Sequence, residues 1–275
     1  MSALALHLDA LRRQAGVVMP SLPPRGPVPD DIRRLLGIRT RNEARRSPAS
    51  LDRELPGLEL APGLRLVESV LPRDEVPAQV DLGFVGMEAA AAGRLLHFDT
   101  ETTGLAGGTG TRAFMIGLGQ WCSGGLRLRQ LTITSMAAET AMLEVFASWL
   151  REDSVLVSYN GRCYDSPLLA TRYRLARMAN PLAGLAHADL LFPVRRRFRG
   201  VWENCRLATV ERNWLQVMRE DDLPGSEAPR AWLDYLRGGS AVNLRRVLQH
   251  NDQDLRSLAL LALRLEQAQA QLPET

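Results

Sequence analysis

Short β-rich segments set apart by turn residues dominate the middle of the chain, and segments with helical spacing interrupt and follow them. The predicted strands are residues 64–70, 94–99, 113–119, 126–134 and 155–159. The predicted helices are residues 139–150, 166–178, 202–215 and 255–270. Strands that come first and then mix with helices predict a mixed α/β domain. Strict alternation over 126–134 also predicts that one face of that strand is exposed.

The length of 275 residues suits one large domain, or one and a half small ones. Five prolines between residues 20 and 29 rule out regular structure there, and nine arginines occur before residue 50. We therefore interpret residues 1–55 as an Arg- and Pro-rich extension or linker, or as an arm packed on the domain. Residues 56–270 are the predicted folded domain.

The 34 residues counted as lysine plus arginine are all arginine, because the sequence contains no lysine. This excludes lysine-dependent phosphate loops, Schiff-base enzymes and lysine nucleophiles. The net charge is only +3, but Arg195, Arg196 and Arg197 form a local basic cluster. Guanidinium groups bind phosphate oxygens in a bidentate manner, so the cluster either follows a nucleic-acid backbone or is a solvated helix face.

The three cysteines are Cys122, Cys163 and Cys205, which are too far apart to form a CxxC pair. Neither a disulfide framework nor a zinc site is expected. No apolar stretch approaches the roughly 20 residues that span a bilayer. Charges interrupt the first twenty residues, which do not resemble a secretory signal. We therefore expect a cytoplasmic protein with no membrane contact.

The stretch Phe98-Asp99-Thr100-Glu101 puts two carboxylates at the end of a predicted buried strand. Because strand side chains alternate between faces, Asp99 and Glu101 project to the same side. They repel each other unless a divalent cation such as Mg²⁺ or Mn²⁺, which prefers oxygen ligands, lies between them. The alternative is a surface turn in which Asp99 and Thr102 cap the loop.

Two further segments offer acidic side chains. Asp165 stands just ahead of a predicted helix, where it either caps that helix or reaches a metal held by Asp99. His250 and Asp254 are four residues apart and share a face if the C-terminal helix already includes His250. If Asn251 instead caps the helix, Asp254 belongs to a capping box.

Together these segments supply one histidine, His250, and four carboxylates, Asp99, Glu101, Asp165 and Asp254. Such a set suits phosphodiester hydrolysis by two metal ions, of which one activates water and the other stabilises the leaving oxygen. Imidazole accepts protons near neutral pH, so His250 is the expected general base.

Four segments resemble those of YprB-type ribonuclease-H-like domains, a family of the DEDD exonuclease superfamily. They are LLHFDTETTGLAGGTGTRAFMIGLG, LVSYNGRCYDSPLL, HADLLFPVRRRF and VLQHNDQDLRSLALL, in this order between about residues 55 and 265. The resemblance implies a twisted mixed sheet flanked by helices. The family's DxE motif falls on Asp99 and Glu101, its second aspartate on Asp165, and its final histidine and aspartate on His250 and Asp254.

The resemblance also implies a metal-dependent exonuclease that degrades DNA from 3' to 5' with two Mg²⁺ or Mn²⁺ ions. A setting in DNA repair beside a helicase partner is implied by the family alone. DEDDh exonucleases usually have four residues between the histidine and the last aspartate, whereas three separate His250 from Asp254. YprB-type domains share this shorter spacing.

Several neighbouring residues are candidates for contacts with nucleic acid. The threonines and glycine after Glu101 would offer N–H and hydroxyl groups to a terminal nucleotide, and Asn160 a side-chain amide, unless these residues only shape turns. The expected contacts are Thr102, Thr103, Gly104, Asn160, Arg195, Arg196 and Arg197. We expect His187 and Asp189 to support the site rather than bind metal.

Two alternative functions remain open from the sequence. One is a catalytically weak nucleic-acid-binding or helicase-adaptor module, although four clustered negative charges oppose phosphate binding. The other is an RNA-directed nuclease, which keeps the chemistry and changes the substrate.

Overall fold

The structure is a computed structural model that describes residues 51–104, 110–219 and 222–271. Contacts divide the chain into residues 1–49 and 50–275, and everything described belongs to the second unit. Most of the predicted extension therefore lies outside the described residues. Its last residues contact the domain, because Leu55 is buried in the core and Asp52 forms an ion pair with Arg245.

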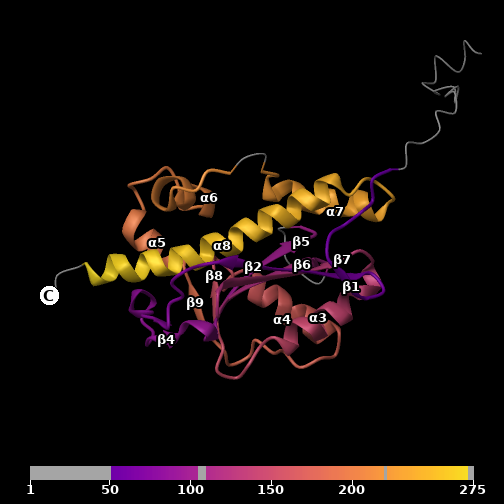
Figure 1. The fold of residues 1–275 in the computed structure, drawn as a ribbon. Coiled ribbons are helices and arrows are strands. Elements are labelled where there is room, and N and C mark those ends of the chain that lie inside the picture. The colour runs from indigo at the N-terminus through magenta and orange to yellow at the C-terminus, as the bar shows by residue number, and fades with distance from the viewer. Residues whose placement is uncertain (1–50, 105–109, 220–221, 272–275) are drawn as a thin grey trace, which may run out of the picture. The chain divides into compact units, whose positions relative to one another are not determined.

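A seven-stranded sheet lies at the centre of this unit (Figure 1). In spatial order its strands are β1 (Leu58–Ala61), β2 (Leu64–Pro72), β7 (Gly125–Ile133), β6 (Ala113–Cys122), β5 (Leu95–Thr102), β8 (Val155–Ser158) and β9 (Ala186–Asp189). The first five pair antiparallel, whereas β8 and β9 run parallel to β5. The carboxyl ends of β5, β8 and β9 therefore meet at one edge of the sheet. A separate small sheet pairs β3 (Gln79–Val80) with β4 (Ala90–Ala91).

Helices cover both faces of the large sheet, as predicted (Figure 1). On one face lie α3 (Glu139–Ser148) and α4 (Asp165–Leu175), and the long α8 (Val242–Ala270) crosses the other. On the α8 side lie α5 (Leu191–Phe198), α6 (Leu207–Val210) and α7 (Ala228–Leu236). The short helical segments are η1 (Gly83–Val85), η2 (Ala92–Arg94), η3 (Met136–Ala138), η4 (Glu211–Leu215) and η5 (Gly225–Glu227).

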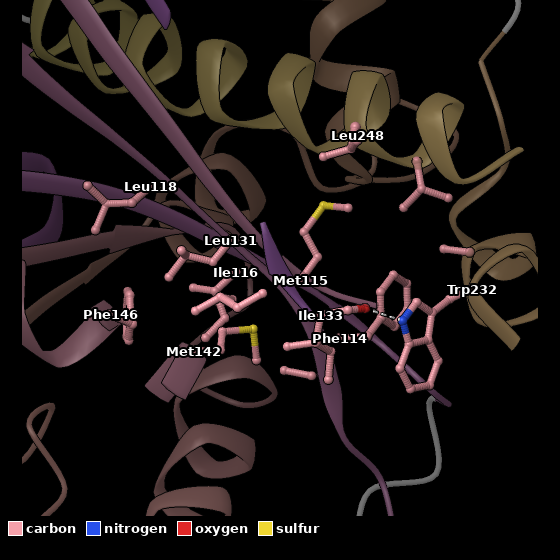
Figure 2. Close-up of a cluster of buried hydrophobic side chains, with 14 of the residues drawn as sticks. Phe114, Met115, Ile116, Leu118, Leu131, Ile133, Met142, Phe146, Trp232 and Leu248 are labelled. Carbon is pink, nitrogen blue, oxygen red and sulfur yellow. Dashed lines mark hydrogen bonds between the residues drawn. The ribbon is translucent and has the colours of Figure 1, made fainter. Parts of the chain in front are cut away.

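Apolar side chains fill the space between these layers, and Figure 2 shows part of this core. Met115 of β6 and Leu248 of α8 belong to the same buried cluster. Trp232 of α7 stacks on Phe114 with ring centroids 5.0 Å apart, and its Nε1 donates to the carbonyl of Ile133 at 2.7 Å. These contacts anchor α7 to β6 and β7.

The structure confirms the five predicted strands and changes several details. The strand at 126–134 is not half exposed, because α3 and α8 pack on its two faces and bury its Gln130 and Thr132. The C-terminal helix begins at Val242 rather than near 255. The helix expected over 202–215 starts only at Leu207 and ends as a π-helix. Among the described helices, none is long and apolar enough to cross a membrane.

Candidate active site

Strand β5 carries Asp99 on the face that α8 covers. Its partner in the register is Gly117 of β6, and the missing side chain there leaves room for Asn251 of α8. The Asn251 Nδ2 donates to Asp99 Oδ2 at 2.8 Å, and its Oδ1 accepts from Gln130 Nε2 at 2.9 Å. Asp99 is therefore held by a buried amide chain rather than capping a surface turn.

Helix α8 brings His250 and Asp254 to the cavity that Asp99 and Glu101 line. Both are in the middle of the helix, so the prediction that they share a face is confirmed. Asp252 lies outside this cavity and pairs with Arg256 at 2.6 Å. Asn251 is likewise in the middle of α8 and does not cap it.

Asp165 approaches from the other face of β5. It is the first residue of α4, and its side chain accepts a hydrogen bond from the hydroxyl of Thr100 instead of capping its own helix. Thr100 points away from the face of Asp99 and Glu101 because neighbours in a strand alternate. Burial raises the pKa of Asp165 to about 6, although the bond from Thr100 opposes this change.

The four carboxylates are close enough to act on one another's protonation. The pKa of Asp99 lies well above its usual range, first because of burial and then because of the charges on Asp254, Asp165 and Glu101. Burial also raises the pKa of Glu101, as do the charges of Asp254 and Asp165. Burial raises the pKa of Asp254 as well, with Arg219 opposing it. The site thus concentrates carboxylates, and Arg219 supplies positive charge that opposes the raised pKa values of Glu101 and Asp254.

Two cavities of about 280 and 400 Å³ meet at the end of β5. Both are lined by Asp99, Thr100, Thr102 and Gly104. The smaller also includes Thr111, Tyr159, Asn160, Tyr164, Asp165 and Leu168. The larger also includes Glu101, Gly225, Ser226, Pro229, His250 and Asp254. Each of the five predicted catalytic residues therefore lines at least one of these adjoining cavities.

Three charged residues that the sequence analysis did not select complete the site. Arg219 donates to Asp254 Oδ1, and its Nη2 and Nε bind the two carboxylate oxygens of Glu211 at 2.6 and 2.7 Å. Asp222 Oδ1 lies 2.6 Å from His250 Nδ1. The acidic run that follows Arg219 is the only local signal for Arg219 and Asp222, and it has no strand or helix pattern, whereas Glu211 falls within the helix predicted over 202–215.

The donor set fits divalent cations by its chemistry. Carboxylate oxygens from β5, α4 and α8 face two adjoining cavities, and a cation between them would offset the mutual repulsion that, after burial, raises the pKa values of Asp99 and Glu101. In the part of the chain that the structure describes, no three His, Cys, Asp or Glu side chains converge closely enough to form a ready metal site. Among these residues the carboxylates therefore do not yet form a complete set of metal ligands, and the guanidinium of Arg219 lies against Asp254.

The expected nucleotide contacts in the loops lie partly at the cavities. Thr102 and Gly104 line both cavities, and Asn160 lines the smaller one. Thr103 instead exchanges two hydrogen bonds with the backbone of Arg112, at 2.9 and 3.0 Å, and thereby closes the base of the loop. The glycine-rich stretch at 105–109 lies outside the described residues.

Asp189 and His187 support the site from β9. Buried Asp189 accepts backbone N–H bonds from Asn160 at 2.7 Å and from Arg162 and Leu191, each at 3.1 Å. His187 Nε2 lies 2.7 Å from Ser158 Oγ, and burial lowers the His187 pKa to about 4. Neither residue lines the two cavities at β5, which agrees with the expected supporting role.

The basic cluster lies on α5, away from the carboxylates. Arg195, Arg196 and Arg197 are exposed and line neither cavity at β5. Arg196 donates to the carbonyl oxygen of Phe84, and Arg197 lies 5.8 Å from the ring centroid of Trp214. The structure therefore does not bring these arginines into the candidate site.

Comparison with known proteins agrees with this geometry. A family model described as RNase_H superfamily matches residues 96–266. The chain belongs to the RNase_H superfamily. The uncharacterized protein YprB of Bacillus subtilis (strain 168) is 34% identical over 172 residues, a match that covers 62% of this chain and 41% of that protein. The match thus spans less than half of the relative, and it confirms the predicted YprB-type ribonuclease-H-like domain.

The RNase H-like fold also occurs in a solved DNA polymerase. The family B DNA polymerase of the hyperthermophilic archaeon Pyrobaculum calidifontis aligns with a TM-score of 0.51 and 17% identity. The alignment covers 72% of this chain and 28% of the polymerase chain. At this identity the likeness shows the fold alone. The superfamily match supports a nuclease-type function and hence a nucleic-acid substrate.

Proposed function

We propose that this RNase H superfamily chain is a metal-dependent exonuclease that hydrolyses DNA from the 3' end with two Mg²⁺ or Mn²⁺ ions. The observation that carries the proposal is that carboxylates from β5, α4 and α8 line two adjoining cavities. DNA and the 3'-to-5' direction rest on the resemblance to DEDD exonucleases, and the structural neighbour is itself a DNA polymerase. A role in DNA repair beside a helicase partner rests on the resemblance alone.

In this mechanism Asp99, Glu101, Asp165 and Asp254 would hold the metal ions. When bound, the ions would lower the pKa of water and offset the charge that develops on the leaving oxygen. His250 takes the proton from the attacking water. The carboxylate of Asp222, with Oδ1 2.6 Å from Nδ1, favours the tautomer that carries its proton on that nitrogen and leaves Nε2, on the side of Asp254, to act as the base.

The substrate contacts divide into two groups. Backbone and side-chain groups of Thr102, Gly104 and Asn160 bind the terminal nucleotide in the cavities at β5. Arg195 and Arg197 form no ion pair within the described ranges, and they contact phosphates of the DNA farther from the cut. Thr103 does not contact the substrate; it closes the base of the loop after β5 through its hydrogen bonds with the backbone of Arg112.

The test is digestion of single-stranded DNA labelled at either end, beside RNA of the same sequence. A 3'-to-5' exonuclease shortens the 5'-labelled strand stepwise and releases the 3' label as a mononucleotide. We expect Mn²⁺ or Mg²⁺ to be required, and Asp99→Asn to lower the rate at least roughly a hundredfold with the fold intact. Asp252→Asn, on α8 but outside the cavity, is the matched control. Cleavage that persists in EDTA or in Asp99→Asn would contradict the proposal.

A catalytically weak nucleic-acid-binding or helicase-adaptor module is the second candidate. It is favoured by the lack of three converging metal ligands in the described residues. Salt-dependent binding of single strands without Mn²⁺-stimulated cleavage would support it. Faster digestion of the RNA than of the DNA would instead identify an RNA-directed nuclease.

A further inference from the structure

Arg219 is the cation in contact with the carboxylates of the candidate site. Its Nη2 donates to Asp254 Oδ1, and its Nη1 lies 3.3 Å from Asp222 Oδ2 and 3.1 Å from His250 Nδ1. The same guanidinium holds both oxygens of Glu211 at 2.6 and 2.7 Å. One side chain thus contacts three carboxylates and the expected general base.

A buried ion pair with Glu211 holds the side chain of Arg219 in position. The side chain of Glu211 is only 1% exposed and that of Arg219 12%, and Ser257 of α8 donates a further hydrogen bond to Glu211. A bidentate arginine–carboxylate pair at such burial is geometrically specific. Removing one partner alone leaves an uncompensated buried charge, which is strongly unfavourable. The guanidinium of Arg219 is therefore held in a defined position beside Asp254.

This contact divides the candidate metal site into two unequal halves. At Asp254 both carboxylate oxygens face protein nitrogen atoms, Oδ1 that of Arg219 and Oδ2 that of His250 at 3.6 Å. At the other half, Asp99 accepts from the neutral amide of Asn251. Within residues 51–104, 110–219 and 222–271, neither Asp99 nor Glu101 forms an ion pair. A metal ion therefore meets two carboxylates without a direct ion-pair partner at one half, where Arg219 only partly offsets the charge of Glu101, and a carboxylate already bound to the guanidinium at the other.

We propose that Arg219 is a resident counter-cation that competes with a divalent metal for Asp254. The chain then binds one ion tightly at Asp99 and Glu101, and a second ion only at higher concentration, when the guanidinium gives up Asp254. The inference rests on the proposed metal-dependent function. It adds that the two metal positions differ in affinity, and that Arg219 causes this difference.

The test measures Mn²⁺ binding to the full chain by calorimetry and by electron paramagnetic resonance, without substrate. We expect wild type to bind one Mn²⁺ tightly and a second at least tenfold more weakly. The double variant Arg219→Gln/Glu211→Gln removes the buried pair together, and we expect its second Mn²⁺ to bind at least tenfold more tightly than in wild type. Arg256→Gln, which breaks the pair with Asp252 outside the site, should leave both affinities unchanged.

A second variant keeps the inference testable if the double variant does not fold. Asp254→Asn should abolish the weak Mn²⁺ site and leave the tight one within about threefold of wild type. Loss of the tight site in Asp254→Asn would overturn the inference, and so would a second site that is as tight as the first in wild type. Wild type that cleaves DNA with two equal Mn²⁺ sites would contradict only this inference. Wild type that neither binds Mn²⁺ nor cleaves would contradict the proposed function itself.

Discussion

The side-chain amide of Asn251 on α8 donates to Asp99 on β5 at 2.8 Å; Asn251 is buried, whereas Asp99 is partly exposed at the cavities. This bond fixes the rotamer of the first carboxylate of the site. We expect Asn251→Ala to lower the nuclease rate by about ten- to a hundredfold, because Asp99 loses its orienting partner. The free energy of unfolding should fall by about 1–3 kcal/mol, since Gln130 also loses a buried acceptor.

Steady-state digestion and urea unfolding of the same preparation check this expectation. Asn243→Ala is the matched control, because Asn243 is an exposed residue of the same helix. Wild-type rates in Asn251→Ala would show that Asp99 needs no support from α8.

Gly117 on β6 should tolerate no side chain. A Cβ at this position would lie 2.1 Å from Asn251 Oδ1 and 2.9 Å from Leu255 Cδ1. We expect Gly117→Ala to destabilise the domain by about 1–3 kcal/mol through overpacking and to reduce activity by displacing Asn251. Thermal unfolding together with the digestion assay measures both effects. Gly93→Ala is the control, because a Cβ at this position would lie at an ordinary 3.6 Å from its nearest atom. A Gly117→Ala variant with the same stability and activity as Gly93→Ala would refute the crowding argument.

The loop after β8 should depend on Asp189. This buried carboxylate accepts backbone N–H bonds from Asn160, Arg162 and Leu191. Bonds to a charged acceptor contribute about 1.5–3 kcal/mol each, so Asp189→Ala should destabilise the domain by several kcal/mol, whereas Asp189→Asn retains one oxygen and should cost less. We also expect the KM for DNA to rise in Asp189→Asn more than kcat falls, because Asn160 loses its position. Equal stability of the two variants would contradict this role.

Local patterns predicted the parts of the site that lie on regular elements. Alternation along β5 placed Asp99 and Glu101 on one face, and the four-residue spacing on α8 placed His250 beside Asp254. Both patterns depend only on backbone geometry, so neighbours in the sequence are enough to reveal them. The end of the first core strand and the face of the long helix could therefore be predicted in advance.

The remaining contacts could not be predicted because they depend on tertiary structure. The sequence suggests that Asp165 caps a helix, but it is the first residue of α4, and its carboxylate accepts a hydrogen bond from Thr100 of a distant strand. Arg219 follows the π-helix that carries Glu211, in a stretch with no periodic pattern, and only the packing of this stretch on α8 brings Arg219 to Asp254. The role of Asn251 likewise requires the close approach of α8 to Gly117.

The metal-free protein should become less stable as the pH rises through about 6. Burial raises the pKa of Asp165 to about 6, whereas an unfolded aspartate titrates near 3.9. The native state then binds the proton more tightly, so the stability that this group contributes is full below about pH 4 and is lost as the pH rises through about 6. Asp99, Glu101 and Asp254 shift in the same direction.

Urea unfolding in EDTA between about pH 4.5 and 7.5 measures this loss. We expect the midpoint of wild type to fall over that range, and Asp165→Asn to flatten the fall because an amide does not titrate. Asp252→Asn should behave as wild type, since its carboxylate pairs with Arg256 outside the cavities. Mn²⁺ should restore the wild-type midpoint near pH 7.5, because a bound cation replaces the lost protons as the partner of the carboxylates. An identical pH dependence in wild type and Asp165→Asn would mean that Asp165 titrates as an ordinary aspartate.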